Sequence, residues 1–186
     1  IAVKMLDNII DINNFPLPQY ENYQKNFRTI GLGVTGLADT LAMLNIKYNS
    51  PEAIEYVDNL MELIAIAAYR ASIELAKERG SFPFLKADQF IQSGYLCRHR
   101  SGKNYEAWIE ITNDILQYGI RNARLLSIAP TGTLSLTFGN NCSSGIEPIF
   151  SLGYDRKVKI GGQNEEDAQT IHISDYAYNM YTQNTK

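Results

Sequence analysis

The stretch Leu125-Leu126-Ser127-Ile128-Ala129-Pro130-Thr131-Gly132-Thr133-Leu134-Ser135 decides the fold class of this chain. Its apolar beginning is typical of a buried strand, and the Pro-Thr-Gly-Thr sequence predicts a tight turn. The turn offers successive backbone N–H groups and the hydroxyls of Thr131, Thr133 and Ser135. Such amides suit a phosphate group, because each N–H points a partial positive charge at the anion. Turns of this composition are more often only turns, so the residues alone leave both interpretations open.

Upstream of this stretch, apolar residues recur at helical spacing. Ser50 as N-cap and Pro51 at the first helical position open the longest pattern, a mostly buried helix that ends at Gly80. A loop follows the first helix near residues 13–18, and the polar stretch over residues 19–26 then leads to Gly31. In total, the spacing predicts helices over residues 3–12, 37–44, 51–79, 86–94 and 105–118.

Downstream of the turn, the sequence changes to short strands and loops. Residues 145–150 and 154–160 predict further strands, residues 161–167 an exposed turn, and a last helix follows Ser174-Asp175. Helices that alternate with buried strands argue for an α/β fold. We therefore expect one domain fragment over residues 1–186, mainly helical over residues 1–120 and strand-and-loop over residues 121–186.

Composition excludes several classes of function. The formal net charge of −3 provides no basic field, so nucleic acid is not expected as a direct partner. No run approaches the ~18 apolar residues of a membrane span, so no membrane contact is expected. Cys97 and Cys142 are far apart, with His99 and His172 as the only histidines, so we expect no metal site and two free thiols. The first residue is Ile1, which we interpret as the start of a piece of a longer protein.

Gly31-Leu32-Gly33-Val34-Thr35-Gly36 has the spacing of a dinucleotide-binding loop. That loop needs a buried strand directly before its first glycine, whereas residues 21–28 are polar. The acids about 20 residues further on lie in the predicted long helix rather than at the end of a strand. We favour glycines that permit close packing where a helix begins, with a cofactor site as the alternative. No P-loop sequence is present.

Other polar residues carry weaker signals. Glu147 lies in an apolar stretch and is either a buried acid with a raised pKa or, as we prefer, a structural acid that holds a loop. His99 lies in a basic loop and His172 between two isoleucines, and neither has the partners of a general base. Three tyrosines are expected to pack rather than to relay a radical: Tyr176, Tyr178 and Tyr181.

Residues 121–133 (RNARLLSIAPTGT) and 144–148 (SGIEP) closely resemble the large subunit of ribonucleotide reductases. The likeness extends to three further stretches, which are residues 2–16 (AVKMLDNIIDINNFP), 28–41 (RTIGLGVTGLADTL) and 75–84 (LAKERGSFPF). In that family the catalytic domain is a ten-stranded α/β barrel, and this chain resembles roughly its C-terminal half. The resemblance implies that the missing barrel half is a partner and that the glycine motif is a structural helix start.

The resemblance also assigns the site. The turn is similar to the loop that holds the substrate's diphosphate through backbone amides, and Gly132 is expected to adopt a geometry that a Cβ would disfavour. The family's hydrogen-abstracting cysteine, in an Asn-x-Cys-x-Glu context, and its reducing pair have no match here. No catalytic residue, no cofactor-binding residue and no role for either cysteine is therefore assigned, and the chain alone is expected to be inactive. The substrate-phosphate contacts fall on Pro130, Thr131, Gly132, Thr133 and Leu134.

The turn, the SGIEP stretch and residues 154–157 look most like the adenosylcobalamin (vitamin B12)-dependent class. The resemblance implies a cytoplasmic oxidoreductase that makes deoxyribonucleotides for DNA synthesis and replication by thiyl-radical chemistry. It implies a ribonucleoside di- or triphosphate substrate, adenosylcobalamin as cofactor and a thioredoxin-type reductant for the full-length protein. The alternative is a stand-alone nucleotide- or phosphate-binding α/β module without catalysis.

Overall fold

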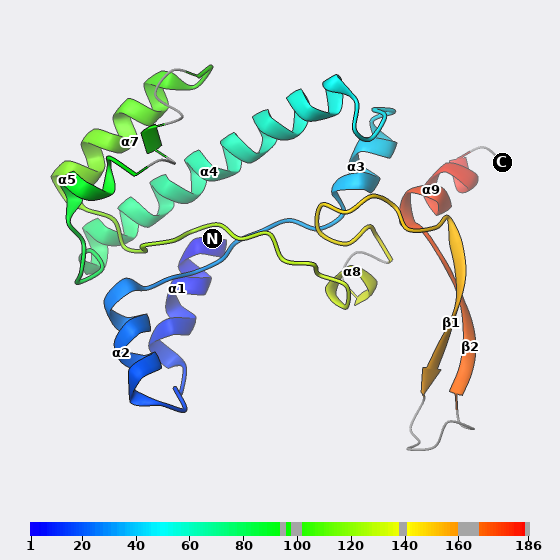
Figure 1. Cartoon of the computed structure of the whole chain (residues 1–186), viewed down its shortest axis with the longest axis horizontal. Coiled ribbons are helices and arrows are strands. Elements are labelled where there is room, and N and C mark those ends of the chain that lie inside the picture. The colour runs from blue at the N-terminus through cyan, green and yellow to red at the C-terminus, as the bar shows by residue number, and fades with distance from the viewer. Residues whose placement is uncertain (94–95, 98–101, 138–140, 160–167, 185–186) are drawn as a thin grey trace. The chain divides into compact units, whose positions relative to one another are not determined.

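The computed structural model describes residues 1–93, 96–97, 102–137, 141–159 and 168–184, and most of its elements are helices (Figure 1). The predicted turn over residues 161–167 and the basic residues 98–101 lie outside this part. No helix within it is long and apolar enough to cross a membrane. The elements are α1 (Ala2–Ile12), α2 (Pro18–Phe27), α3 (Leu37–Met43), α4 (Pro51–Arg79), α5 (Ala87–Phe90), α7 (Tyr105–Tyr118), α8 (Leu134–Thr137), β1 (Gly153–Lys159), β2 (Ala168–Ser174) and α9 (Tyr176–Asn184).

The helices expected from apolar spacing are confirmed as α1, α3, α4, α5, α7 and α9. The N-cap of α4 is also confirmed, because Ser50 Oγ accepts the Ala53 N–H at 3.1 Å. The polar stretch over residues 19–26, for which the spacing predicted no helix, lies within α2. This helix buries no residue and begins at Pro18, and it is stabilised by a Glu21–Lys25 ion pair of 2.6 Å and by ring contact between Tyr23 and Phe27.

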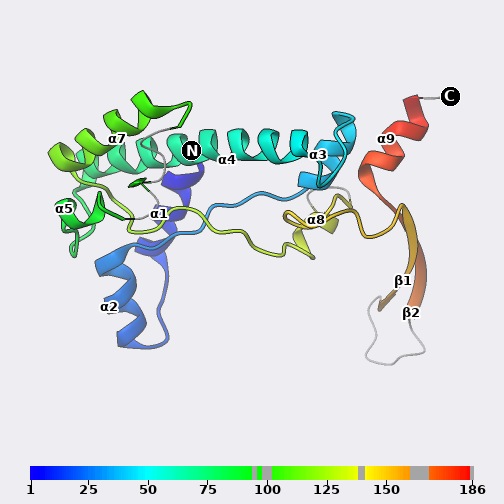
Figure 2. The ribbon, with the colours of Figure 1, turned by 45° about the horizontal axis from the view of Figure 1, so that its top comes forward.

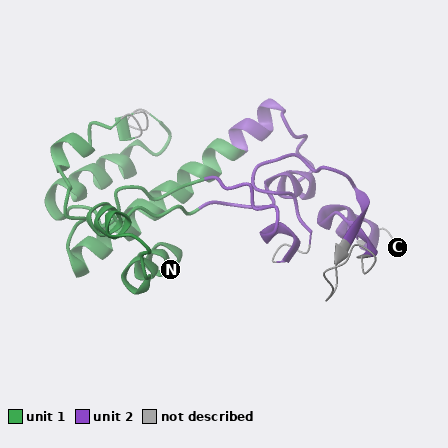
Figure 3. Cartoon of the chain, turned by 60° about the horizontal axis from the view of Figure 1, so that its bottom comes forward, with its two compact units in different colours: residues 1–32, 57–127 green, residues 33–56, 128–186 purple. Residues whose placement is uncertain are grey.

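The chain divides into two compact units, which Figure 3 colours separately. Unit 1 comprises residues 1–32 and 57–127, and unit 2 comprises residues 33–56 and 128–186. The core of unit 1 surrounds Trp108, which is fully buried and donates its Nε1–H to Glu62 Oε1 at 2.9 Å. Apolar side chains from several segments pack in this core, among them Val3, Ile10, Ile66, Ile73, Phe82, Ile111, Ile115 and Leu125. The expectation of one domain fragment divided near residue 120 stays a prediction.

Two extended segments of unit 1, residues 28–32 and 121–127, run parallel to each other. Ile30 N–H donates to Arg124 O at 3.0 Å and Leu32 N–H to Leu125 O at 2.8 Å, with one parallel bridge between Leu32 and Leu126. The buried strand expected over residues 125–128 is therefore only a short pairing, too brief for a regular strand. Its first residue is buried and its last is exposed.

Gly31 confirms the close-packing interpretation of the glycine motif. A Cβ at this position would lie 2.9 Å from the Cβ of Ser127, nearer than real Cβ atoms approach. Glycine therefore allows the two extended segments of unit 1 to pair. No strand precedes it, because residues 18–27 are helical.

Unit 2 contains a hairpin of β1 and β2, paired antiparallel from Gly153 opposite Ser174 to Lys159 opposite Ala168. Figures 1 and 2 show the two strands side by side, with α9 directly after β2. The strand expected over residues 145–150 is wrong, because Gly145 has a φ of +50° and Pro148 has no N–H to donate. This hairpin is the only sheet among the described residues, so they do not display the expected ten-stranded barrel.

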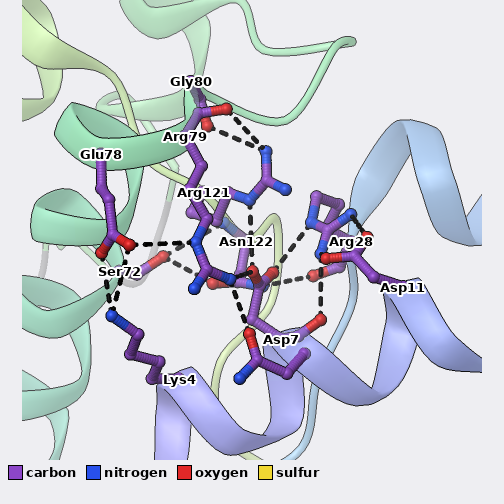
Figure 4. Close-up of polar contacts among 11 residues, drawn as sticks. Lys4, Asp7, Asp11, Arg28, Ser72, Glu78, Arg79, Gly80, Arg121 and Asn122 are labelled. Carbon is purple, nitrogen blue, oxygen red and sulfur yellow. Dashed lines mark hydrogen bonds and ion pairs between the residues drawn. The ribbon is translucent and has the colours of Figure 1, made fainter.

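A buried carboxylate joins the segments of unit 1 (Figure 4). Asp7 in α1 is fully buried and accepts hydrogen bonds from Arg28 Nε at 2.8 Å, Asn122 Nδ2 at 3.0 Å and Arg121 Nε at 3.3 Å. Arg28 also donates through Nη1 and Nη2 to both carboxylate oxygens of Asp11, and this hydrogen bonding lowers the pKa of Asp11. A buried charge with several charge-assisted donors resists rearrangement, because each lost donor leaves a charge without compensation.

We predict that Asp7→Asn lowers the free energy of unfolding of the chain by about 3–5 kcal/mol, because it removes the buried counter-charge that Arg28 and Arg121 share. Glu110→Gln, which removes an exposed ion pair with Arg70, is the matched control and should change stability little. Urea unfolding followed by the fluorescence of Trp108, the single tryptophan, measures both. Equal stability of the two variants would contradict the role of the network.

Candidate functional site

The turn over residues 130–134 lies in unit 2 and leads into the one-turn helix α8. Thr131 has a φ of +51°, in the left-handed region that a β-branched residue rarely adopts. Gly132 has no positive φ, and a Cβ added to it would meet nothing within 4 Å. The expectation that Gly132 needs glycine geometry is therefore wrong. The backbone strain of the turn lies one residue earlier, at Thr131.

The Thr131 side chain is engaged inside the protein. Its Oγ1 accepts the Gly145 N–H at 2.7 Å and lies 2.9 Å from Thr35 Oγ1. Ser135 is buried and its Oγ donates to Gly132 O at 3.2 Å. Two of the three hydroxyls expected to be available to a phosphate therefore make internal contacts, and only the exposed Thr133 hydroxyl is available.

Three successive backbone donors of the turn face no protein acceptor. The N–H groups of Gly132, Thr133 and Leu134 make no hydrogen bond within the described part of the chain, and all three residues are exposed. The next amide, of Ser135, donates to Thr131 O at 2.8 Å and closes the turn. The arrangement thus combines a fixed backbone with consecutive available donors, which is the requirement for an anion-binding nest.

Two cavities adjoin the turn, and Arg156 of β1 lines both. The smaller, of about 110 Å³, is also lined by Gly132, Cys142 and Glu147. The larger, of about 700 Å³, is lined by Thr133 together with Arg156, Lys157 and His172 from the hairpin, among others. Cationic side chains therefore lie around the available amides and favour an anionic ligand.

Asp39 of α3 and Asp175, which precedes α9, form a buried acidic pair in unit 2. Each is 3% exposed. Asp39 Oδ1 accepts the Ser143 N–H at 3.3 Å, and Asp175 Oδ1 accepts the Tyr178 N–H at 3.1 Å. Asp39 Oδ2 is buried with no hydrogen-bond donor in the described structure. Burial and the charge of Asp175 raise the pKa of Asp39 to about 6, and hydrogen bonding with the Asp175 side chain contributes to this rise.

The acid, cysteines and histidines singled out in the sequence lie as follows. Glu147 is exposed, so its interpretation as a buried acid is wrong, and its N–H donates to Ser144 O. Cys97 and Cys142 are free thiols as expected, and burial raises the pKa of Cys142. His172 pairs with Asp155 at 2.8 Å on the exposed hairpin, whereas His99 lies outside the described residues.

The tyrosines expected to pack are only partly covered, since Tyr178 and Tyr181 are exposed. Both line an apolar cavity of about 520 Å³ together with Met43 and Leu152. No group of three His, Cys, Asp or Glu side chains that could hold a metal ion occurs among the described residues.

The sequence interpretation missed three features of the site: Thr35, Arg156 and the Asp39–Asp175 pair. Thr35 lies within the glycine motif and Arg156 within a predicted strand, and neither side chain was assigned a role in the site. Asp39 carried a readable signal, because a charged residue in the apolar run Leu37-Ala38-Asp39-Thr40-Leu41 is unexpected on a buried helix face.

Comparison with known proteins agrees with the sequence resemblance. A family model described as "Ribonucleotide reductase, barrel domain" matches residues 1–184. The vitamin B12-dependent ribonucleoside-diphosphate reductase of Mycobacterium tuberculosis is 38% identical over 158 residues, covering 85% of this chain and 19% of the relative. The protein of the same name from Thermoplasma acidophilum is 38% identical over 160 residues, covering 86% and 18%.

The ribonucleoside-diphosphate reductase subunit alpha of Chlamydia pneumoniae is 36% identical over 165 residues, covering 81% of this chain and 16% of the relative. The chain thus spans about a fifth of the length of the curated relatives it matches.

The raised pKa of Asp39 predicts a pH-dependent stability. The folded chain keeps this proton up to about pH 6, whereas the unfolded chain releases it near 3.8, so the free energy of unfolding falls between those values as pH rises. We expect a loss of about 1–3 kcal/mol, which Asp39→Asn removes. Urea unfolding at pH 4, 5, 6 and 7.5 tests this, with the exposed Asp88→Asn as control. A slope that Asp39→Asn leaves unchanged would exclude the pair as its cause.

Proposed function

This chain belongs to the ribonucleotide reductase barrel-domain family, and from that premise we propose that its turn over residues 130–134 holds the phosphates of a ribonucleotide. The chain then forms part of a reductase that converts ribonucleoside di- or triphosphates to 2′-deoxyribonucleotides. The observation that carries the proposal is the row of available N–H groups at Gly132, Thr133 and Leu134. Exposed backbone donors in consecutive positions bind phosphate oxygens without the desolvation cost of a buried lysine.

Each residue of the turn has its own part in this proposal. Pro130 has no N–H and fixes its own φ, and Thr131 holds the shape through internal bonds. Gly132, Thr133 and Leu134 donate their amides, and the Thr133 hydroxyl adds one more donor. Arg156 lies beside them and supplies positive charge without occupying the nest.

The chemistry of reduction belongs to the full-length protein. We propose adenosylcobalamin as its cofactor, because two of the relatives are named vitamin B12-dependent; when bound, it supplies the radical that starts reduction. No residue of this chain is assigned to its binding. A thioredoxin-type reductant, a role in DNA synthesis and a cytoplasmic setting follow from the family resemblance alone.

We further propose that residues 28–32 and 121–127 are neighbouring strands of the α/β barrel in the full-length protein. Their parallel bridge and backbone hydrogen bonds support this, because parallel neighbours are the rule in α/β barrels. The missing barrel half would extend the short pairing into a regular sheet.

We predict that Gly132→Val in the full-length enzyme weakens ribonucleotide binding by tenfold or more without lowering the melting temperature. In the free turn a Cβ at position 132 meets no other atom within 4 Å. A valine side chain would, however, occupy the space in which a phosphate approaches the amide. Thr133→Val removes one hydroxyl donor and keeps the amide, so it should cost about 1–2 kcal/mol of binding. Thr40→Val, whose hydroxyl donates to Gly36 O, is the control. Substrate titration and thermal unfolding of the same variants decide, and a Gly132→Val enzyme that melts early yet binds normally would rule out the phosphate role.

We also predict that the 186-residue chain alone forms no deoxyribonucleotide, with or without adenosylcobalamin and dithiol. Neither Cys97 nor Cys142 has the Asn-x-Cys-x-Glu context of the family's abstracting thiol. Product analysis of the purified chain beside the full-length enzyme measures this. Deoxyribonucleotide from the chain alone would show that it carries catalytic groups of its own.

A further inference from the structure

Thr35 contacts the phosphate turn although it lies 96 positions before Thr131. Thr35 belongs to the glycine motif over residues 31–36, in which Gly31 permits close packing against Ser127. Its Oγ1 lies 2.9 Å from Thr131 Oγ1 and 3.2 Å from Ser143 O. All three residues belong to unit 2.

The direction of each hydrogen bond in this contact follows from proton counting. Ser143 O has no proton, so the Thr35 hydroxyl must donate to it. Gly145 N–H must donate, and its shorter contact is to Thr131 Oγ1 at 2.7 Å. The Thr131 hydroxyl proton is then left for Thr35 Oγ1. The result is a directed chain from Gly145 N–H through Thr131 and Thr35 to Ser143 O. Gly145 N–H also has a longer contact of 3.3 Å with Thr35 Oγ1.

This hydrogen-bonded chain holds Thr131 in its strained conformation. At a φ of +51°, a β-branched residue keeps its backbone only where the surroundings determine it. The Thr131 hydroxyl is fixed from two sides, by Gly145 and by Thr35, and its backbone orientation sets the direction of the following amides. If Thr131 returned to a negative φ, the N–H groups from Gly132 onward would point elsewhere.

Resting on the proposed function, we propose that Thr35 is a positioning residue for phosphate binding, which acts through Thr131. The loop that supplies the acceptor is fixed independently of the Thr35 side chain. Gly36 N–H donates to Ser143 O at 2.8 Å, and Leu37 N–H donates to Gly145 O at 3.3 Å. Loss of the Thr35 hydroxyl removes its contacts with Thr131, Ser143 O and Gly145 N–H, while these two backbone hydrogen bonds still hold the loop.

The test uses the full-length enzyme with Thr35→Val, which removes the hydroxyl at equal size, and Thr35→Ser, which keeps it. We expect Thr35→Val to raise KM for the ribonucleotide about tenfold with kcat and melting temperature nearly unchanged. Thr35→Ser should restore KM. The control is Thr40→Val, which removes a hydroxyl bond to Gly36 O in α3 and has no contact with the turn.

A double-variant comparison separates positioning from general stability. If Thr35 acts through Thr131, Thr35→Val adds nothing to the KM of a Thr131→Ala enzyme. Additive effects, or an equal KM increase in Thr40→Val, would overturn the proposal. Should Thr35→Val not fold, Thr131→Ala removes the same link from its other side, and a normal KM there also overturns it.

The same experiment distinguishes this inference from the proposed function. Normal KM in Thr35→Val together with weakened binding in Gly132→Val rejects the role of Thr35 and keeps the phosphate turn. Normal binding in both rejects the phosphate turn itself.

Discussion

The buried carboxylate of Asp7 is the contact on which the folding of unit 1 depends. Its donors come from Arg28, Arg121 and Asn122, which lie 21, 114 and 115 positions away in the sequence. An apolar core tolerates many arrangements of similar volume, but a buried charge tolerates only those that bring its donors into place. The carboxylate therefore selects which extended segments meet, and Gly31 then lets them approach.

The turn in unit 2 follows a different principle, since its backbone is fixed so that some donors remain available. Strain at Thr131 is held by hydroxyl and amide bonds, and the following amides have no acceptor among the described residues. Unpaired amides are tolerated here because they are exposed to water, which a ligand can displace. In unit 1 the buried carboxylate of Asp7 thus finds its donors within the protein, whereas the turn keeps its donors available.

The sequence predicted those parts of the fold that local periodicity and capping determine. Six helices were found because each presents apolar residues at helical spacing or a cap such as Ser50. Helix α2 was missed because it buries nothing, so its stability comes from a charge pair and aromatic contacts that a periodicity argument ignores. The strands over residues 125–128 and 145–150 were overpredicted, because apolar composition does not show whether a partner strand is present.

For the site, sequence reasoning located the turn but assigned its constraint to the wrong residue. Glycine was read as the strained position because it usually is, whereas a positive φ at Thr131 depends on contacts with Thr35 and Gly145 that are distant in sequence. The same limit applies to Glu147, whose apolar neighbours suggested burial although the loop turns them outward. Such properties follow from tertiary contacts and are not encoded in any local window.

In this turn, the residues that the fold constrains differ from the residues that are available to a ligand, although all of them belong to one sequence motif or its neighbouring loop. Residues 131 and 145 are constrained by contacts within the protein. Thr131 keeps an unfavourable φ through the hydrogen bonds of its hydroxyl. Gly145 has no room for a Cβ, which would lie 2.7 Å from Ala129 O. Gly132 has no such internal constraint, so the free fold does not require glycine there. If only the fold mattered, position 132 would accept any small residue. A requirement for glycine at this position must then come from outside the chain, from whatever approaches its amide.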